Sequence, residues 1–211
     1  MMMATHAEIV IACLDAALAA ILAHEEELGK LDAVAGDGDH GAGMARGFRA
    51  ACAANHDGTA TQVLTKAGAA FSDAAGGASG ALVGMFLMSA GRALTDPIDA
   101  NTVHTALNKG IDAIIKLGKA TAGDKTMLDT LIPFAAAYGQ AAQTGASVRA
   151  AWETALPAAQ AGMESTAQMI AKRGRAAVLK DRSLGTPDAG ATSMYDVFAA
   201  VGRVLVAHCP A

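Results

Sequence analysis

Hydrophobic residues recur every three or four positions along most of this 211-residue chain. Between Thr5 and Leu28, for example, Ile9, Cys13 and Ala16 follow this spacing. The period is that of an α-helix with one buried face. Eight stretches carry it or are otherwise typical of helices, and they cover residues 5–28, 42–55, 60–75, 80–94, 101–118, 126–143, 146–173 and 190–207.

The stretches between these helices are mostly short and rich in glycine, and no run alternates clearly enough between apolar and polar residues to predict a strand. Short links favour antiparallel neighbours. The sequence therefore predicts an all-α protein, an up-and-down bundle or a closed ring of eight antiparallel helices. The length fits one domain that spans residues 1–211.

Composition supports this prediction and narrows the function. The chain is 53% hydrophobic and only 4% aromatic, which suits closely packed helices. A net charge of −4 offers no basic face for a nucleic acid. Three distant cysteines fit reduced thiols, and Asp15 interrupts the only run that resembles a signal or a membrane span. We therefore expect a cytoplasmic protein that binds neither nucleic acid nor membrane.

The stretch DAVAGDGDHGAG, residues 32–43, places Asp32, Asp37 and Asp39 close together. Three neighbouring carboxylates repel one another unless a cation lies between them. Hard oxygen ligands select Mg²⁺, Ca²⁺ or Mn²⁺ over Zn²⁺. A calcium-binding loop that begins at Asp37 would need glutamate where Phe48 stands, so magnesium fits better.

Magnesium sites often use substrate phosphates as further ligands, and glycines beside the aspartates would let backbone N–H groups approach a phosphate at the next helix start. The stretch is not a Walker loop, because it lacks the G-x-x-x-x-G-K-[ST] pattern. The alternative is an Asp/Gly turn whose acids only cap the next helix.

Three further motifs point to the same chemistry. The GGASG motif, residues 76–80, offers amides and Ser79 at a helix start, or else a tight helix corner. In AGDKTMLDTLIP, Asp124 resembles a helix cap, and Met127 could face a base or pack in the core. The polar segment 174–193 contains Arg175 and Arg182, which could bind phosphate or simply be solvated.

Taken in order, D-x3-GDGDHG at 32–41, GGASG-x-L-x-G at 76–84, GDKTMLD at 123–129 and GRA-x-x-L-x-x-RS-x-G-x-x-D-x-GATS at 174–193 resemble the nucleotide-binding subunit, subunit L, of dihydroxyacetone kinases. The resemblance spans nearly the whole chain. It implies an eight-helix antiparallel barrel with the nucleotide, ADP or ATP, at one end. It also implies two Mg²⁺ ions on Asp32, Asp37 and Asp39.

The resemblance also assigns roles to other residues. Arg175 would be catalytic and would stabilise charge on the transferred phosphoryl group. The family often has asparagine where Gly43 stands, so Gly43 would contribute only its backbone. The nucleotide-binding residues that the resemblance implies are His40, Gly41, Ala42, Gly43, Ala78, Ser79, Gly118, Thr126, Met127, Arg175, Asp188, Ala189 and Gly190.

The family resemblance further implies a partner, subunit K, which holds the ketose covalently through a histidine. The chain would then donate the phosphoryl group in line from a magnesium-bound nucleotide to the primary hydroxyl of that ketose. In one version ADP stays bound and is rephosphorylated by a phosphohistidine protein of the phosphotransferase system. In the other, ATP exchanges with each turnover.

Several alternatives remain at the level of sequence. The substrate could be a tetrose such as erythrulose, because specificity would lie in subunit K. The chain could instead be a regulatory module that senses a nucleotide and binds a transcription factor, or a helical scaffold without metal. Alanine-rich helix faces could form a homodimer or pack inside the ring.

Overall fold

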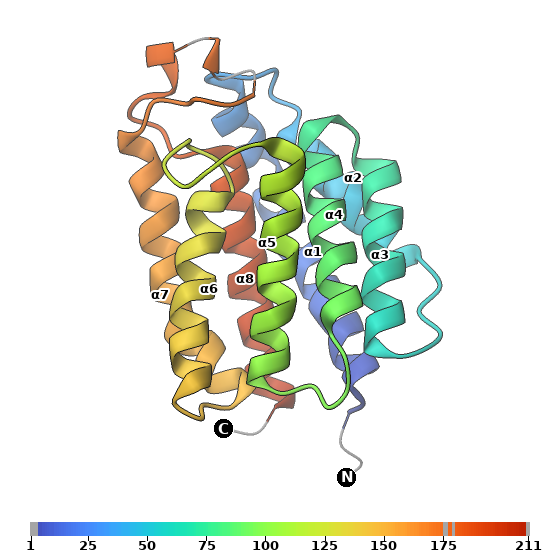
Figure 1. Cartoon of the computed structure of the whole chain (residues 1–211). Coiled ribbons are helices and arrows are strands. Elements are labelled where there is room, and N and C mark those ends of the chain that lie inside the picture. Colours follow the sequence, from blue (N-terminus) through green and yellow to red (C-terminus); the bar gives the residue numbers. More distant parts are fainter. Residues whose placement is uncertain (1–3, 175–176, 179, 210–211) are drawn as a thin grey trace.

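The computed structural model describes residues 4–174, 177–178 and 180–209. Within this part of the chain the regular structure is entirely helical, as predicted (Figure 1). Long helices run up and down side by side, and among the described residues the 3-10 helices η1 and η3 lie between the last two of them. Their bounds are α1 His6–Ala33, α2 His40–Ala53, α3 Ala60–Ala75, α4 Gly77–Ala93, α5 Ala100–Gly118, α6 Leu128–Gln143, α7 Val148–Ser165, η1 Thr166–Gln168, η3 Lys180–Ser183 and α8 Ala189–His208.

The long helices form a closed ring. Each packs against its neighbour in the chain, and α1 packs against α8. The links α1–α2, α3–α4, α5–α6 and α7–α8 gather at one end of this barrel, at the top of Figure 1. The other links lie at the opposite end with both ends of the chain. The predicted antiparallel barrel is therefore confirmed.

Local sequence explains where the helices begin. Thr5 and Thr59 each accept a hydrogen bond from the backbone N–H three residues later, and the side chains of Glu8 and Gln62 accept in return from the two threonine N–H groups. These reciprocal bonds satisfy N–H groups that have no partner inside a helix.

Two predicted helix ends were wrong. The first helix does not stop near Gly29 but continues to Ala33, so Asp32 lies in its last turn. A glycine is tolerated there because α2 approaches closely: a Cβ atom added at Gly41 would lie 3.2 Å from the nitrogen of Gly29. The seventh helix ends at Ser165 and not at residue 173. A 3-10 turn begins at the next residue, Thr166.

The barrel interior is apolar but not filled throughout. Phe134 contacts Trp152 and Phe198 with ring centroids 4.8 and 4.6 Å apart, which joins α6, α7 and α8. A cavity of about 570 Å³ is lined mainly by apolar side chains, among them Phe48 and Phe86. It reaches the end of the barrel where the chain termini lie, because residues at the starts of α1 and α5 and at the end of α8 also line it.

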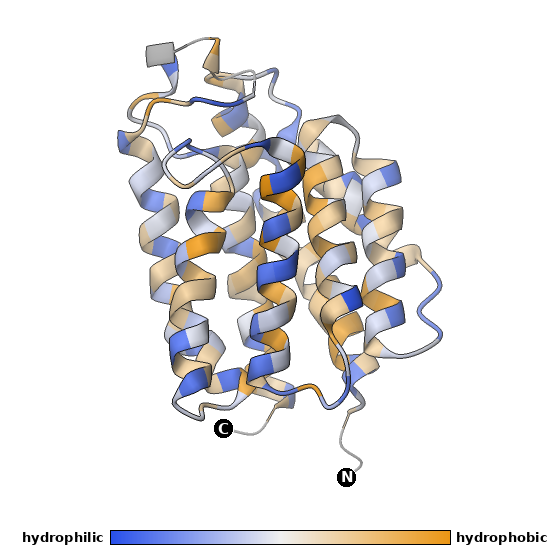
Figure 2. Cartoon of the chain, viewed as in Figure 1, coloured by the Kyte–Doolittle hydropathy of each residue, from blue (hydrophilic) through white to orange (hydrophobic). Residues whose placement is uncertain are grey.

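Exposed faces are more polar than the contacts between helices. Helix α5 presents hydrophilic residues outward and hydrophobic residues along its sides (Figure 2). By length and composition alone α1 could cross a membrane, a test that core helices and signal sequences also pass. In this structure α1 packs against α2 and α8 as a wall of the barrel.

Candidate functional site

All four motifs found in the sequence meet at one end of the barrel, where the links α1–α2, α3–α4, α5–α6 and α7–α8 gather (Figure 1). Residues 34–39 join α1 to α2, Gly76 joins α3 to α4, residues 119–127 join α5 to α6, and residues 166–188 join α7 to α8. An up-and-down ring forces this convergence, because every second link returns to the same end. We call the described residues of this last stretch, 166–174, 177–178 and 180–188, the α7–α8 segment.

The three aspartates lie together, as predicted. Asp32, Asp37 and Asp39 each place a carboxylate oxygen within 4.8 Å of the others. Asp32 is half-buried, whereas Asp37 and Asp39 are exposed. This arrangement gathers three hard oxygen donors at the surface, which is a donor set that suits Mg²⁺.

Backbone hydrogen bonds hold this cluster in place. Asp32 Oδ2 accepts from the N–H groups of Gly38 at 2.8 Å and Asp39 at 3.1 Å. Gly38 has φ of 78°, a conformation that glycine adopts readily. Asp39 occupies the N-cap position of α2, yet its side chain makes no capping bond. The alternative of acids that only cap a helix therefore fails for Asp39.

The glycines of this loop have structural reasons of their own. A Cβ atom at Gly36 would lie 2.4 Å from Asp32 Oδ1, and one at Gly41 would lie 2.0 Å from the carbonyl oxygen of Glu25. Gly36 thus makes room for the carboxylate, and Gly41 lets α2 approach α1. Ala42 and Gly43 follow in the first turn of α2 and are half-buried.

His40 begins α2 and is buried. Its Nε2 lies 2.9 Å from Ser193 Oγ on α8, and Ser193 Oγ in turn donates to the carbonyl oxygen of Gly190. Burial lowers the pKa of His40, while the nearby Asp32 charge opposes this effect. The imidazole therefore joins α2 to the start of α8, a use that the sequence did not reveal.

The start of α4 lies beside this first turn of α2. Gly76 and Gly77 have positive φ angles of 73° and 65°, and Ala78 is exposed beside the half-buried Ser79. A Cβ atom at Gly43 would lie 3.4 Å from the carbonyl oxygen of Ala75, which connects α2 with the end of α3. Gly118, at the end of α5, faces Leu82 on α4.

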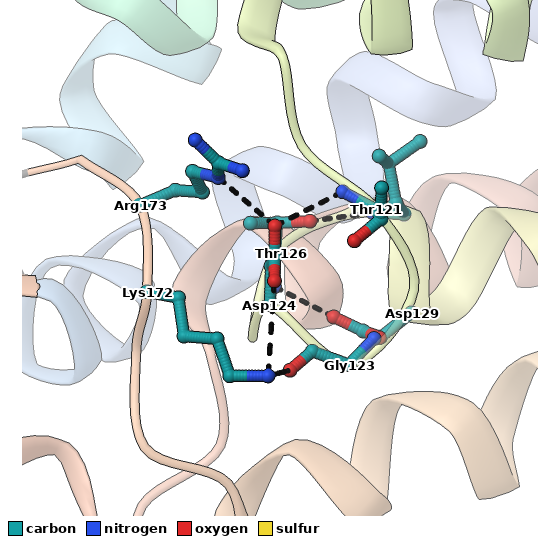
Figure 3. Close-up of polar contacts among 8 residues, drawn as sticks. Thr121, Gly123, Asp124, Thr126, Asp129, Lys172 and Arg173 are labelled. Atoms are coloured by element: carbon teal, nitrogen blue, oxygen red, sulfur yellow. Dashed lines mark hydrogen bonds and ion pairs between the residues drawn. The ribbon is translucent and has the colours of Figure 1, made fainter.

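The link between α5 and α6 is organised by a residue that we did not single out. Asp129 Oδ1 accepts from the N–H of Gly123 at 2.5 Å, and its Oδ2 accepts from the N–H of Thr126 at 2.8 Å (Figure 3). The prediction that Asp124 caps this helix was wrong. The spacing Thr126-x-x-Asp129 is a capping pattern that the sequence already contained.

Asp124 instead contacts the α7–α8 segment. Its buried carboxylate accepts from Arg173 Nε at 2.9 Å and lies 3.8 Å from Lys172 Nζ (Figure 3). The hydrogen bond from Arg173 holds the pKa of Asp124 below its usual value, although burial acts in the opposite direction. The backbone N–H of Lys172 also donates to the carbonyl oxygen of Asp124 at 3.1 Å.

Lys125 is buried and has a positive φ of 62°. Its ammonium donates to the carbonyl oxygens of Met169, Ser183 and Thr186, all in the α7–α8 segment. Burial lowers the pKa of Lys125. No sequence pattern marked this contact, because its partners lie 44 to 61 positions away.

The start of α8 completes the site. Asp188 Oδ1 accepts from the N–H of Ala191 at 2.8 Å, and the N–H of Asp188 donates to Thr166 Oγ1 at 2.9 Å. Burial raises the pKa of Asp188 to about 6. Met127 is buried, and a Cβ atom at Gly190 would lie 3.6 Å from its Cβ, so Met127 packs against the start of α8.

A small cleft of about 40 Å³ connects these parts. Asp32, Lys125, Asp188 and Ala189 all line it. Residues of the first, third and fourth motifs therefore share one space, and three of the residues that line it, Asp32, Asp188 and Ala189, are predicted site residues. Arg182 is exposed, and Arg175, our predicted catalytic residue, lies outside the described residues.

Comparison with known families shows which domain family contains this fold. Residues 34–203 match the model of the DAK2 domain. The chain belongs to the DAK2 domain family. Along 80% of its length it is 36% identical to the ADP-binding subunit DhaL of the PEP-dependent dihydroxyacetone kinase of Escherichia coli strain K12, and the match covers 83% of that subunit.

Other DAK2 domain relatives are longer. The chain is 43% identical over 94% of its length to L-erythrulose kinase of Pectobacterium atrosepticum, but the match covers only 35% of that enzyme. Crystal structures of the dihydroxyacetone kinase of C. freundii, native and with AMP-PNP and Mg²⁺, superpose with TM-scores of 0.72 and 0.69 at 28% identity. They cover 93% of this chain, which spans 34% of theirs.

Proposed function

We propose that this DAK2 domain is the nucleotide-binding, phosphoryl-donating part of a kinase for a short-chain ketose. The observation that carries the proposal is the cluster of Asp32, Asp37 and Asp39 at the end of the barrel where all four motifs meet. The names of the relatives, which are dihydroxyacetone and erythrulose kinases, support it. We take residues 1–211 as one domain and the cytoplasm as its location, in line with three free cysteines.

The aspartate cluster fits the magnesium that the second C. freundii structure contains together with AMP-PNP. All three donors are carboxylates, and two of them are exposed, so a polyphosphate can reach the same ion. We propose two Mg²⁺ ions held by Asp32, Asp37 and Asp39. Bound magnesium would neutralise charge on the phosphates and on the transferred group.

The remaining predicted residues surround this cluster, and we propose that they bind the nucleotide. Backbone N–H groups of residues 40–43 and 78–79, at two helix starts, would bind the phosphates. Because the imidazole of His40 is used by Ser193, we assign its contribution to the backbone. The base and the sugar would lie near Gly118, Thr126 and Met127. Residues 188–190 would close the site. Arg175 would stabilise the transferred phosphoryl group.

The ketose would be held by a separate subunit or domain, the equivalent of subunit K. The description of the Escherichia coli relative as an ADP-binding subunit supports this division of labour. The residues of this chain then have two tasks, which are to orient the nucleotide and to keep water away from the phosphoryl group. We propose dihydroxyacetone or a tetrulose such as erythrulose as the substrate, selected by the partner.

Two donors are compatible with this site. In the first version ADP stays bound and is rephosphorylated by a phosphohistidine protein of the phosphotransferase system, as the PEP-dependent relative suggests. The second version, ATP exchange in an erythrulose kinase, is favoured by the higher identity of 43% to L-erythrulose kinase. Retention of ADP through extensive dialysis would support the first version, and rapid release would support the second.

Mass spectrometry of the protein as isolated tests the proposal, with titration by Mg²⁺ and ADP as the quantitative assay. We expect Mg²⁺-dependent ADP binding that chelation abolishes. Asp112→Ala is a matched control, because Asp112 is an exposed aspartate on α5. Wild-type protein that binds no ADP in Mg²⁺, or an Asp37→Ala variant with unchanged affinity, would refute the proposal.

A further inference from the structure

We propose that Asp124 and Lys125 are positioning residues that clamp the α7–α8 segment over the nucleotide. This inference rests on the proposed function, because it concerns the same site. The two residues are adjacent in the link between α5 and α6, carry opposite charges and are both buried. Each of them holds a different part of the α7–α8 segment.

Lys125 forms the first half of the clamp. A lysine ammonium has three donors, and here all three are used by the carbonyl oxygens of Met169, Ser183 and Thr186. Only 4% of the residue is exposed, so water cannot replace these partners. If the α7–α8 segment moved away, a buried cation would lose its hydrogen bonds, which is strongly unfavourable.

Asp124 forms the second half and engages the segment with the opposite polarity. Its carboxylate accepts from Arg173 Nε (Figure 3), and its backbone carbonyl accepts from the N–H of Lys172. The side chain of Lys172 reaches further along the link and donates to the carbonyl oxygen of Gly123 at 2.9 Å. The α7–α8 segment is thus held near its beginning by Asp124 and near both of its ends by Lys125.

The contacts of this clamp lie next to the proposed nucleotide-binding residues on both sides. Lys125 directly precedes Thr126 and Met127, and its partner Thr186 stands two positions before Asp188. Lys125 and Asp188 line the same small cleft as Asp32. Because Lys125 binds the α7–α8 segment, it fixes the distance between two sides of the proposed nucleotide site. Residues 126–127 form one side, and residues 188–190 form the other.

Backbone geometry indicates that the lysine is there for its ammonium. Its φ of 62° lies in the left-handed region, where glycine is favoured over residues with a Cβ atom. A side chain at this position carries a conformational penalty that the three hydrogen bonds offset. A glycine here would relieve that penalty and remove the cation, which separates the two contributions.

The test uses Lys125→Met, which removes the ammonium and keeps much of the side-chain length. We expect the Kd for Mg²⁺-ADP, measured by calorimetry, to rise about tenfold or more, because hydrogen bonds to charged groups are lost. Binding of Mn²⁺ alone, measured by electron paramagnetic resonance, should stay within about twofold, because Lys125 donates to the carbonyl oxygens of Met169, Ser183 and Thr186 and is not a proposed metal ligand. Helix content should not change.

Lys119→Met is the matched control. Lys119 belongs to the same link and has a positive φ of 51°, but it is exposed. Its variant should bind Mg²⁺-ADP like the wild type. Lys125→Gly should be as weak as Lys125→Met; affinity equal to that of the wild type would show that the ammonium is dispensable and overturn the proposal.

Asp124→Asn and Arg173→Gln test the other half and keep the proposal falsifiable if Lys125 variants do not fold. Each should raise the Kd for Mg²⁺-ADP, and the double variant should be no weaker than the weaker single variant. Hydrogen exchange in residues 169–173 and 183–188 should accelerate in every clamp variant, while the helices α2 and α3 stay protected.

The outcomes separate this inference from the proposed function. Wild-type protein that fails to bind Mg²⁺-ADP would refute the proposed function. A wild type that binds, together with clamp variants that bind equally well, would refute the clamp alone. Loss of Mn²⁺ binding together with ADP binding in Asp124→Asn would also refute it, because the residue would then support the whole end of the barrel.

Discussion

The two ends of the barrel are built in different ways. At one end, side chains bind the backbone of neighbouring links, as Asp32 does with Gly38 and Lys125 does with Thr186. At the other end, apolar side chains surround a cavity of about 570 Å³. Directional hydrogen bonds therefore define the shape of the first end, whereas burial of apolar surface stabilises the second.

This difference means that ligand affinity and fold stability should respond to different substitutions. Changes among the carboxylates should affect affinity far more than stability. Changes among the cavity-lining residues should do the opposite.

The largest effect on binding is expected for Asp37→Ala or Asp39→Ala. Each removes one proposed metal ligand, so the affinity for Mg²⁺-ADP should fall by more than the roughly 100-fold that follows loss of an outer-shell partner of a metal site. Helix content should stay nearly intact. The Tm of the metal-free variant should be slightly higher than that of the metal-free wild type, because repulsion between carboxylates is relieved. Calorimetry and circular dichroism measure the two quantities. A cooperative loss of helix would show that the acids stabilise the fold instead.

The largest effect on stability is expected for Phe48→Ala. This side chain is 1% exposed, lines the cavity and contacts Phe71 with ring centroids 5.0 Å apart. Its removal should lower the free energy of unfolding by about 3–5 kcal/mol, measured by urea denaturation. The Kd for Mg²⁺-ADP should change by less than about twofold in the folded protein. A large loss of affinity would show that the two ends are coupled.

An intermediate effect on both properties is expected for Gly41→Ala. The new Cβ atom would lie 2.0 Å from the carbonyl oxygen of Glu25, so α1 and α2 must separate. Overpacking of this kind costs about 1–3 kcal/mol of stability. The same shift displaces the Asp39 carboxylate, so Mg²⁺-ADP binding should weaken as well. Unchanged binding would mean that the aspartate loop adjusts independently of the helices.

The smallest effect concerns pH. Because Arg173 lowers the pKa of Asp124 from its ordinary 3.8, folding favours the ionised carboxylate. Its contribution to stability is complete above the ordinary pKa and is lost as the pH falls through the lower value of the folded protein. The difference in Tm between wild type and Asp124→Asn should therefore shrink as the pH falls below about 4. A difference that grows at low pH would reverse the assigned sign.

Sequence predicted the fold well because helix period and link length are local properties. It also predicted that Asp32, Asp37 and Asp39 lie together, since only seven positions separate the first from the last. The end of α1 was missed because Gly29 is tolerated through close packing against α2, a contact between helices. A local sequence pattern does not reveal contacts between helices.

The same limit explains what was missed in the site. The capping role of Asp129 was available in the sequence, but Asp124 was the more obvious candidate beside Gly123. The partners of Lys125 lie on a distant segment, so only the folded chain brings them together. The role of His40 in joining α2 to Ser193 depends on ring closure between α1 and α8 in the same way.

Ring closure has one further consequence. Because α8 returns beside α1, the first and last described residues emerge at the end of the barrel remote from the carboxylates (Figure 1). A tag or a tether attached at either terminus would therefore leave the mouth of the site clear. The same proximity should permit circular permutation, in which the old termini are joined and new ones are opened in a link such as residues 144–147.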